Sequence, residues 1–389
     1  MNFKAYDIIA IRNIEIQKTA QSLLSDNQLT PPQYESVKTE FPIAFKQNNI
    51  FMTIGLFLFT SLCIGFSFGL LSLFFGAAFF SSSGFGGLLL FFAVVTFAAN
   101  EYFIRQNHWY RSGSDNALLY STIICFIGSM VVFTKMDNSM SVYLAFIFSV
   151  LIVAVLRYGD PLLALSAFIT LLLFFFNITK EAGLSLAVIP ISLATVSFTT
   201  YFFSKKQKDE TSAIYWSDCF RLLEIAGLVA FYGSLNYYII QQAAIELDPR
   251  FREEPLPLGN VFALLTASIP ILYIAFGIQK KDRILWIIGG LCAVVSIATY
   301  RYYYSLLPAE WALTLAGGAV LALGLFLMRH FEKPRYGFVY SPELGKNNPI
   351  EALVLNQFLQ QTHSTGSIQD NPPHFGGGSF DGGGAGSEF

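Results

Sequence analysis

The stretch from Phe51 to Asn100 contains no Asp, Glu, Lys or Arg. A charge-free stretch of this length could cross a hydrocarbon core of about 30 Å twice, because each membrane helix needs about 20 residues. In the whole chain of 389 residues only 13% are charged, against roughly 25% in an average soluble domain. The sequence therefore predicts an all-α polytopic transmembrane helix bundle.

Runs of about 18 or more apolar residues, separated by charges or turn formers, mark the individual spans. They predict ten membrane helices within a bundle that covers residues 51–330. We expect the helices near residues 51–75, 85–104, 116–134, 140–156, 161–178, 185–204, 219–241, 260–279, 284–304 and 309–329. A membrane β-barrel would need short alternating segments instead of these solid apolar blocks.

Lysine and arginine side chains gather on alternate connections between the spans. Cytoplasmic connections of membrane proteins carry an excess of these residues. With the amino terminus inside the cell, most of the 24 lysines and arginines fall on the cytoplasmic side. We therefore expect a multi-pass protein of the inner (plasma) membrane, with both termini cytoplasmic.

Two polar segments flank the bundle. Residues 1–50 predict a cytoplasmic helix pair whose second helix begins with Thr30 as the N-cap, Pro31 at the first helical position and Gln33 in a capping box. The pair is too small for a core of its own, so we expect it to rest on the inner face of the bundle. Residues 331–389 predict a cytoplasmic tail, Gly-rich and disordered after about 362.

One candidate group of polar residues lies at the cytoplasmic ends of the predicted spans: Glu101, Arg105, Arg111, Asp115 and Glu224. Ionisable residues near or inside a membrane are costly and often functional. Glu101 and Arg105 have the spacing of a helical ion pair, and Asp115 suits the positive end of a helix. A structural clasp between spans is the alternative to a substrate site. For Glu224 the alternatives are a proton or cation carrier, or a carboxylate compensated by a nearby basic residue.

A second candidate group lies at the outer ends of the spans: Arg301, Tyr237, Tyr238, Tyr300 and Tyr303. One interpretation is an outward-facing pocket in which the arginine binds an anion and the tyrosines contact a ligand. The other is an aromatic belt at the membrane surface with a snorkelling arginine.

Enzyme signatures are absent from the sequence. It contains no Walker-type phosphate loop, HExxH or GxSxG motif, and its four cysteines form no CxxC pair. We expect no enzymatic activity, no cofactor and no metal site.

Two motifs carry a resemblance to other proteins. They are "LLSDNQLTPPQYESV", just before the first span, and "GSDNALLY", at the start of the third. In these the chain resembles an uncharacterised, domain-of-unknown-function family of bacterial polytopic inner-membrane proteins with a short N-terminal cytoplasmic helix pair. The resemblance covers about the first 130 residues and implies the bundle architecture but no particular chemistry.

The number of spans and the two polar groups favour a transporter or permease-like protein for a small solute. The alternative is a membrane scaffold or sensor that recruits partners through its N-terminal segment and tail. The expected partners are the lipid bilayer, a small solute and proteins bound by the cytoplasmic segments. No nucleic acid partner is expected.

Overall fold

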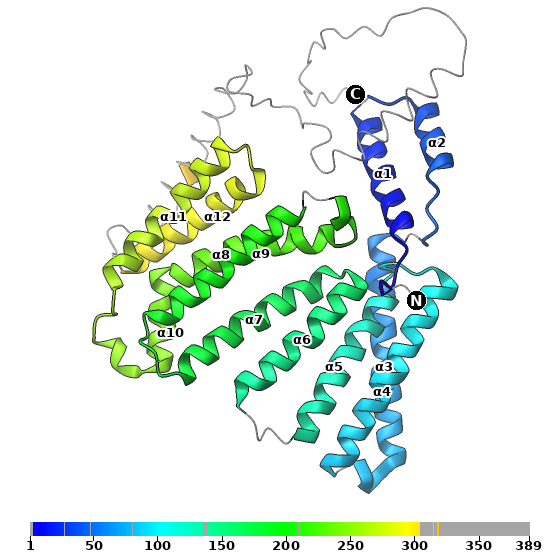
Figure 1. The fold of residues 1–389 in the computed structure, drawn as a ribbon, viewed down its shortest axis with the longest axis horizontal. Coiled ribbons are helices and arrows are strands. Elements are labelled where there is room, and N and C mark those ends of the chain that lie inside the picture. Colours follow the sequence, from blue (N-terminus) through cyan, green and yellow to red (C-terminus); the bar gives the residue numbers. More distant parts are fainter. Residues whose placement is uncertain are drawn as a thin grey trace, which may run out of the picture.

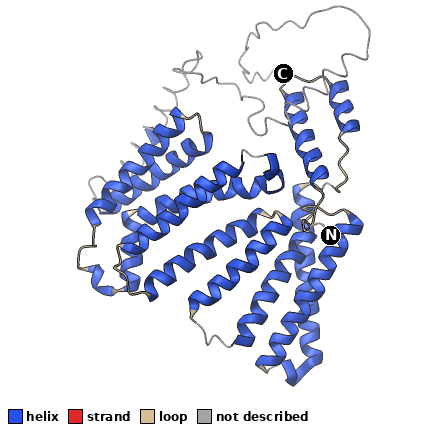
Figure 2. Ribbon diagram, viewed as in Figure 1, coloured by secondary structure: helices blue, strands red, loops and turns tan. Residues whose placement is uncertain are grey.

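The computed structural model describes residues 3–303 except 27, 47, 80, 135–138 and 209–210, together with residues 314, 317 and 318. Within these residues all regular structure is helical (Figure 2). The helices are α1 (Ile8–Ser25), α2 (Pro31–Glu40), α3 (Ile50–Phe79), α4 (Ser82–Asn107), α5 (Ser114–Thr134), α6 (Met140–Tyr158), α7 (Pro161–Glu181), α8 (Val188–Lys208), α9 (Ser217–Leu235), α10 (Tyr237–Leu247), α11 (Gly259–Gln279) and α12 (Arg283–Tyr303), with short 3-10 helices η1 (Thr211–Trp216) and η2 (Pro249–Arg252).

Seven of the described helices are long and apolar enough to cross a membrane: α3, α4, α5, α6, α7, α11 and α12. The number rises to eight if the bent pair of α9 and α10 is one span. The chain thus has the helices of a multi-pass membrane protein. The predicted span at 185–204 corresponds to α8, which ends in three lysines and is not among the seven. The tenth predicted span, 309–329, and the predicted tail lie outside the described residues apart from 314, 317 and 318.

The span predicted at 219–241 is not continuous. It breaks at Asn236, where the chain bends by 66° between α9 and α10. The backbone of Asn236 is extended, with φ −75° and ψ 125°, so the residue ends one helix and caps the next. Asparagine favours such a cap because its side-chain oxygen can accept from the first backbone N–H groups of the following helix.

The helices are arranged as a fan (Figure 1). Helices α3 to α7 lie close together at the end nearest α1 and spread apart toward the other end. Helices α8 and α9 pack side by side, and α11 and α12 form a second close pair beside them. One buried apolar core joins α8 to α12, and another joins the start of α1 to helices α4 to α7.

Helices α1 and α2 project beyond the ends of the bundle helices (Figure 1). They have a small core of their own, which includes the buried residues Ile16, Ala20 and Val37. The expectation that the pair lacks its own core is therefore wrong, because apolar side chains of both helices and of their connection pack against one another. The start of α2 is as predicted: Pro31 is its first residue, and the Gln33 side chain accepts from the Thr30 backbone N–H at 2.9 Å.

A close approach at Gly159 fixes how α6 turns into α7. Gly159 has φ +60°, a left-handed conformation that favours glycine. A Cβ atom at this position would lie 2.8 Å from the backbone oxygen of Tyr215, just before α9. The next residue, Asp160, caps α7 by accepting from the Leu163 backbone N–H at 2.9 Å.

We expect Gly159→Ala to lower the thermal unfolding midpoint of the purified protein by several degrees. The left-handed backbone alone disfavours alanine by roughly 1 kcal/mol, and the contact with Tyr215 adds to this cost. Gly55→Ala in α3 is the matched control, because a Cβ there meets no atom within 4 Å. Equal midpoints for the two variants would contradict the described packing.

Candidate functional site

The break between α9 and α10 is held by a buried polar side chain. Asn236 is fully buried, and its side-chain oxygen accepts from the Ile239 backbone N–H at 3.3 Å. Its amide nitrogen donates to the hydroxyl oxygens of Tyr232, at 2.9 Å, and Thr299, at 3.2 Å. The break in one helix is thus tied directly to α12.

A second polar residue, Thr266, connects α11 to α10 and α12. Its hydroxyl oxygen accepts from the Tyr237 backbone N–H at 2.9 Å and donates to the Phe262 carbonyl at 2.8 Å. Pro270 lies one turn further along α11 and has no N–H to offer the Thr266 carbonyl. The hydroxyl of Ser296 in α12 donates to that carbonyl instead. Backbone groups at the break and at Pro270 thus have side-chain partners inside the protein, which a membrane interior favours.

A cavity of about 470 Å³ lies beside this break, between α10, α11 and α12. Its size is within the range of small-molecule sites. The residues that matter for its chemistry are Tyr237, Asn260, Thr266, Thr299, Tyr300 and Tyr303. The rings of Tyr237 and Tyr303 meet edge to face, with centroids 5.0 Å apart. The cavity thus combines aromatic surfaces with uncharged polar groups.

The predicted tyrosine group divides between this cavity and the outer surface of the helices. Tyr237, Tyr300 and Tyr303 line the cavity, as the pocket interpretation expects. Tyr238 is exposed and packs at 4.9 Å against the exposed Tyr302, as a belt would. Arg301 is half-buried and is not part of the cavity lining. We call this end of the bundle the tyrosine end.

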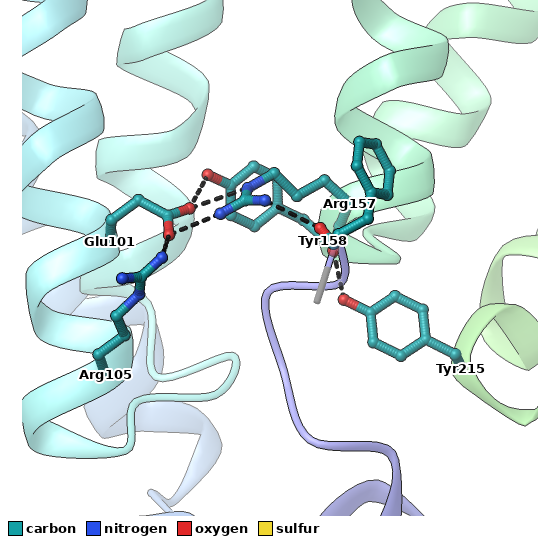
Figure 3. Close-up of polar contacts among 6 residues, drawn as sticks. Glu101, Arg105, Arg157, Tyr158 and Tyr215 are labelled. Atoms are coloured by element: carbon teal, nitrogen blue, oxygen red, sulfur yellow. Dashed lines mark hydrogen bonds and ion pairs between the residues drawn. The ribbon is translucent and has the colours of Figure 1, made fainter. Parts of the chain in front are cut away.

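The opposite end of the bundle carries ion pairs, and we call it the charged end. Glu101 lies at its centre and binds Arg157 of α6 through two hydrogen bonds, Nε to Oε1 at 3.0 Å and Nη2 to Oε2 at 2.7 Å. Arg105 contacts the same carboxylate at 3.3 Å, as the spacing predicts. Figure 3 shows Arg157 between Glu101 on one side and Tyr215 on the other, where the tyrosine hydroxyl donates to the Arg157 carbonyl. Arg157 also donates to the Phe3 carbonyl at 2.8 Å, so it joins α4, α6 and the N-terminal segment.

Two further residues of the first candidate group, Arg111 and Asp115, have other partners. Arg111 pairs with Asp218 at the start of α9 and donates to the Gly159 carbonyl at 3.3 Å. Burial acts to lower the pKa of Arg111, but Tyr110 and Asp218 outweigh it and raise the pKa. Asp115 is buried and accepts from the Ser112 backbone N–H at 2.9 Å, capping the start of α5. Glu101, Arg105, Arg111 and Asp115 therefore do not form one cluster.

The N-terminal segment and the α6–α7 turn add further buried polar groups at the charged end. The Tyr6 hydroxyl donates to Asp115 at 3.4 Å, and burial, followed by the nearby carboxylate, raises the pKa of Tyr6 well above its ordinary value. Asp160 accepts from the Tyr120 hydroxyl at 3.0 Å. Burial raises the pKa of Asp160, although its hydrogen bonds oppose the shift. These hydrogen bonds connect the N-terminal segment to α5, and α5 to the turn where α6 ends and α7 begins.

Two ion pairs close the charged end between α8, α9 and the α11–α12 turn. Lys208 contacts Glu224 at 3.2 Å, and the Glu224 side chain is only 3% exposed. This is the basic compensation that the sequence allowed for, supplied by α8. Lys205 pairs with Asp282, which also caps α12 by accepting from the Ile284 backbone N–H at 3.1 Å. Burial acts to raise the pKa of Asp282, but the Lys205 ammonium outweighs it and holds the pKa below its usual range.

Sequence reasoning missed the residues that organise the break. Asn236 and Thr266 lie inside apolar runs, where a single polar residue gives no pairing information. The available signal was "GSLN" (Gly233–Asn236), because small residues followed by a good N-cap residue are typical of a helix end. Arg157 was not among the candidate residues either, since its partner Glu101 lies far away in the sequence.

No protein-family model, curated protein or solved structure matches the chain. Among the described residues no group of three or more His, Cys, Asp or Glu side chains is placed to hold a metal ion. Any functional conclusion therefore rests on the geometry of the two ends.

Arg157→Ala should destabilise the protein far more than Arg105→Ala, although both remove a partner of Glu101. Arg157 is 20% exposed and makes two hydrogen bonds to Glu101, whereas the Arg105 side chain is 58% exposed. We expect Arg157→Ala to lower the free energy of unfolding by about 2 kcal/mol, which is less than the cost of breaking a fully buried pair because Arg157 is partly exposed. Arg105→Ala should lower it by about 0.4 kcal/mol. Unfolding of both variants in detergent by chemical denaturant measures the difference, and similar losses would refute the central role of Arg157.

Proposed function

We propose that the chain is a transporter or permease-like protein that binds a small solute in the cavity at the tyrosine end. The observation that carries this proposal is the helix break at Asn236 beside a cavity of about 470 Å³. Many secondary transporters bind their substrates where a membrane helix is interrupted, because irregular backbone is tolerated there only next to a cavity or packed protein.

The proposal includes an orientation in the inner (plasma) membrane. The charged end faces the cytoplasm, together with both termini. Its support is the excess of lysine and arginine on this side, including Arg105, Arg111, Arg157, Lys205 and Lys208. The cavity then opens toward the outer surface.

The ion pairs at the charged end supply the second element of a transporter, which is a closed gate. Lys205–Asp282 and Lys208–Glu224 join α8, α9 and the α11–α12 turn. Helices α9, α11 and α12 continue from there to the break and the cavity at the tyrosine end. The two ends of one helix group are therefore in opposite states, one closed by ion pairs and one hollow. Rocking of this group would exchange the two states.

The gate predicts that weakening an ion pair exposes buried residues at the charged end. Ser204 is fully buried beside Lys205, so a cysteine at this position reports opening. In a background without the native cysteines, we expect Asp282→Asn to raise the rate at which Ser204→Cys reacts with a maleimide from the charged end. Loss of the ion pair removes about 1 kcal/mol of stabilisation from the closed state, which corresponds to a rise of about fivefold in the labelling rate.

Two further variants distinguish opening of the gate from a general destabilisation of the protein. Glu35→Gln removes an exposed ion pair in α2 and should leave the Ser204→Cys rate unchanged. A bulky maleimide attached beforehand to Asn260→Cys in the cavity should lower the Ser204→Cys rate, because it holds the tyrosine end open. If the charged end opens regardless of what occupies the cavity, alternating access is ruled out.

One observation favours the second candidate function, a scaffold or sensor. Helices α1 and α2 project from the bundle with a core of their own, so they could present a surface to a protein partner (Figure 1). This function needs no coupling between the two ends. An absence of coupling in the labelling experiment, together with partners crosslinked to residues 1–50 in cells, would favour it.

A further inference from the structure

We infer that the cavity at the tyrosine end takes an uncharged molecule with a flat ring and a hydroxyl group. The inference rests on the proposed function, since it names the class of solute that the cavity would bind. It contradicts the anion that the sequence suggested for Arg301. Three features of the cavity carry it: the charges around it, the hydrogen bonds already made within it, and its aromatic walls.

The first feature is the absence of charged side chains from the described lining. Glu254 and Arg301 neighbour lining residues in the sequence, yet neither contributes to the cavity. A charged solute would lose its hydration on entry and gain no opposite charge, which costs several kcal/mol in an interior site. An uncharged solute avoids this cost.

The second feature is that two of the backbone N–H groups at the start of α10 already have partners. Helix N-termini attract anions through free backbone N–H groups. Here the Tyr237 N–H donates to Thr266, and the Ile239 N–H donates to the side chain of Asn236. These two donors are bonded within the protein, and an anion bound to them would have to displace these contacts.

The third feature is a lining residue whose hydroxyl lacks a partner among the described residues. The Tyr303 hydroxyl is buried and makes no hydrogen bond to any described residue. By contrast, the Tyr300 hydroxyl donates to the Ala263 carbonyl at 2.5 Å, and Thr299 is bonded to Asn236. A buried hydroxyl without a partner costs about 1–3 kcal/mol, which a hydroxyl group on the solute would recover.

The aromatic walls of the cavity are the reason for inferring a solute with a flat ring. Tyr237 and Tyr303 meet at an interplanar angle of 68° and form an aromatic corner. A ring placed in such a corner can meet one wall face to face and the other edge to face, both favourable arrangements. Asn260 provides a second neutral polar group at the exposed rim.

Three probes with one ring and different charges test the inference. Tyrosol is a neutral phenol alcohol, whereas tyramine carries an ammonium group and 4-hydroxyphenylacetate a carboxylate at neutral pH. We expect titration calorimetry on the full chain in lipid nanodiscs to show tyrosol binding at least ~10-fold more tightly than either charged probe, because their charges stay unpaired in the cavity.

Substitution of two adjacent tyrosines shows whether binding is in the cavity. Tyr303→Phe removes the unpartnered hydroxyl and should weaken tyrosol binding by roughly 3- to 10-fold, the worth of one hydrogen bond. Tyr302→Phe is the matched control, because Tyr302 is exposed and lies outside the lining. It should leave the affinity unchanged.

The other outcomes overturn the inference in distinguishable ways. Tightest binding of 4-hydroxyphenylacetate, lost in Arg301→Gln, would restore the anion hypothesis. No binding of tyrosol, or binding insensitive to Tyr303→Phe, would refute the ligand class. The proposed function is tested separately, since the maleimide experiment needs no solute. If the two ends are coupled but tyrosol does not bind, the transporter proposal holds and only the ligand class is wrong. If tyrosol binds but the ends are not coupled, the chain is a binding protein that does not transport.

Discussion

A membrane interior offers no water to a backbone group that lacks a partner, and the structure around Asn236 follows from this constraint. A helix that breaks inside the bundle frees N–H and carbonyl groups. Asn236 accepts from the start of α10, Thr266 accepts from Tyr237, and Ser296 donates to the carbonyl that Pro270 leaves open. The break is therefore stabilised by polar side chains from its own linker, from α11 and from α12. The cavity lies beside these contacts.

The charged end differs from the membrane interior, because it carries charged side chains and these are paired. Glu101, Asp218, Glu224 and Asp282 each bind a lysine or arginine from another element. Three of these pairs, Glu101–Arg157, Arg111–Asp218 and Lys205–Asp282, join segments that are far apart in the sequence, whereas Lys208–Glu224 joins the consecutive helices α8 and α9. The fan shape agrees with this, because the helices α3 to α7 meet at this end and diverge at the other (Figure 1). Ion pairs thus connect the helix ends at the charged end of the bundle.

Part of the candidate site could be predicted from the sequence. The tyrosines near residues 237 and 300 were predicted as a group because aromatic residues at helix ends are conspicuous against an apolar background. Three of them line the cavity, whereas Arg301, the most suggestive residue by type, does not. Which side of α12 faces α10 and α11 depends on how the helices are rotated against each other. That rotation is set by packing contacts that a single sequence does not display.

Composition and hydropathy alone determined that the chain forms apolar membrane helices and where most of them begin and end, because lipid imposes a length and an apolar character on each span. Local signals also determined the start of α2 and the caps around residues 159–161. Only the tertiary structure decided the partners of the buried polar groups. Glu101 binds Arg157 as well as Arg105, and the basic residue that pairs with Glu224 is Lys208 of α8. Such pairs depend on which helices are neighbours, and nothing local in the chain records that.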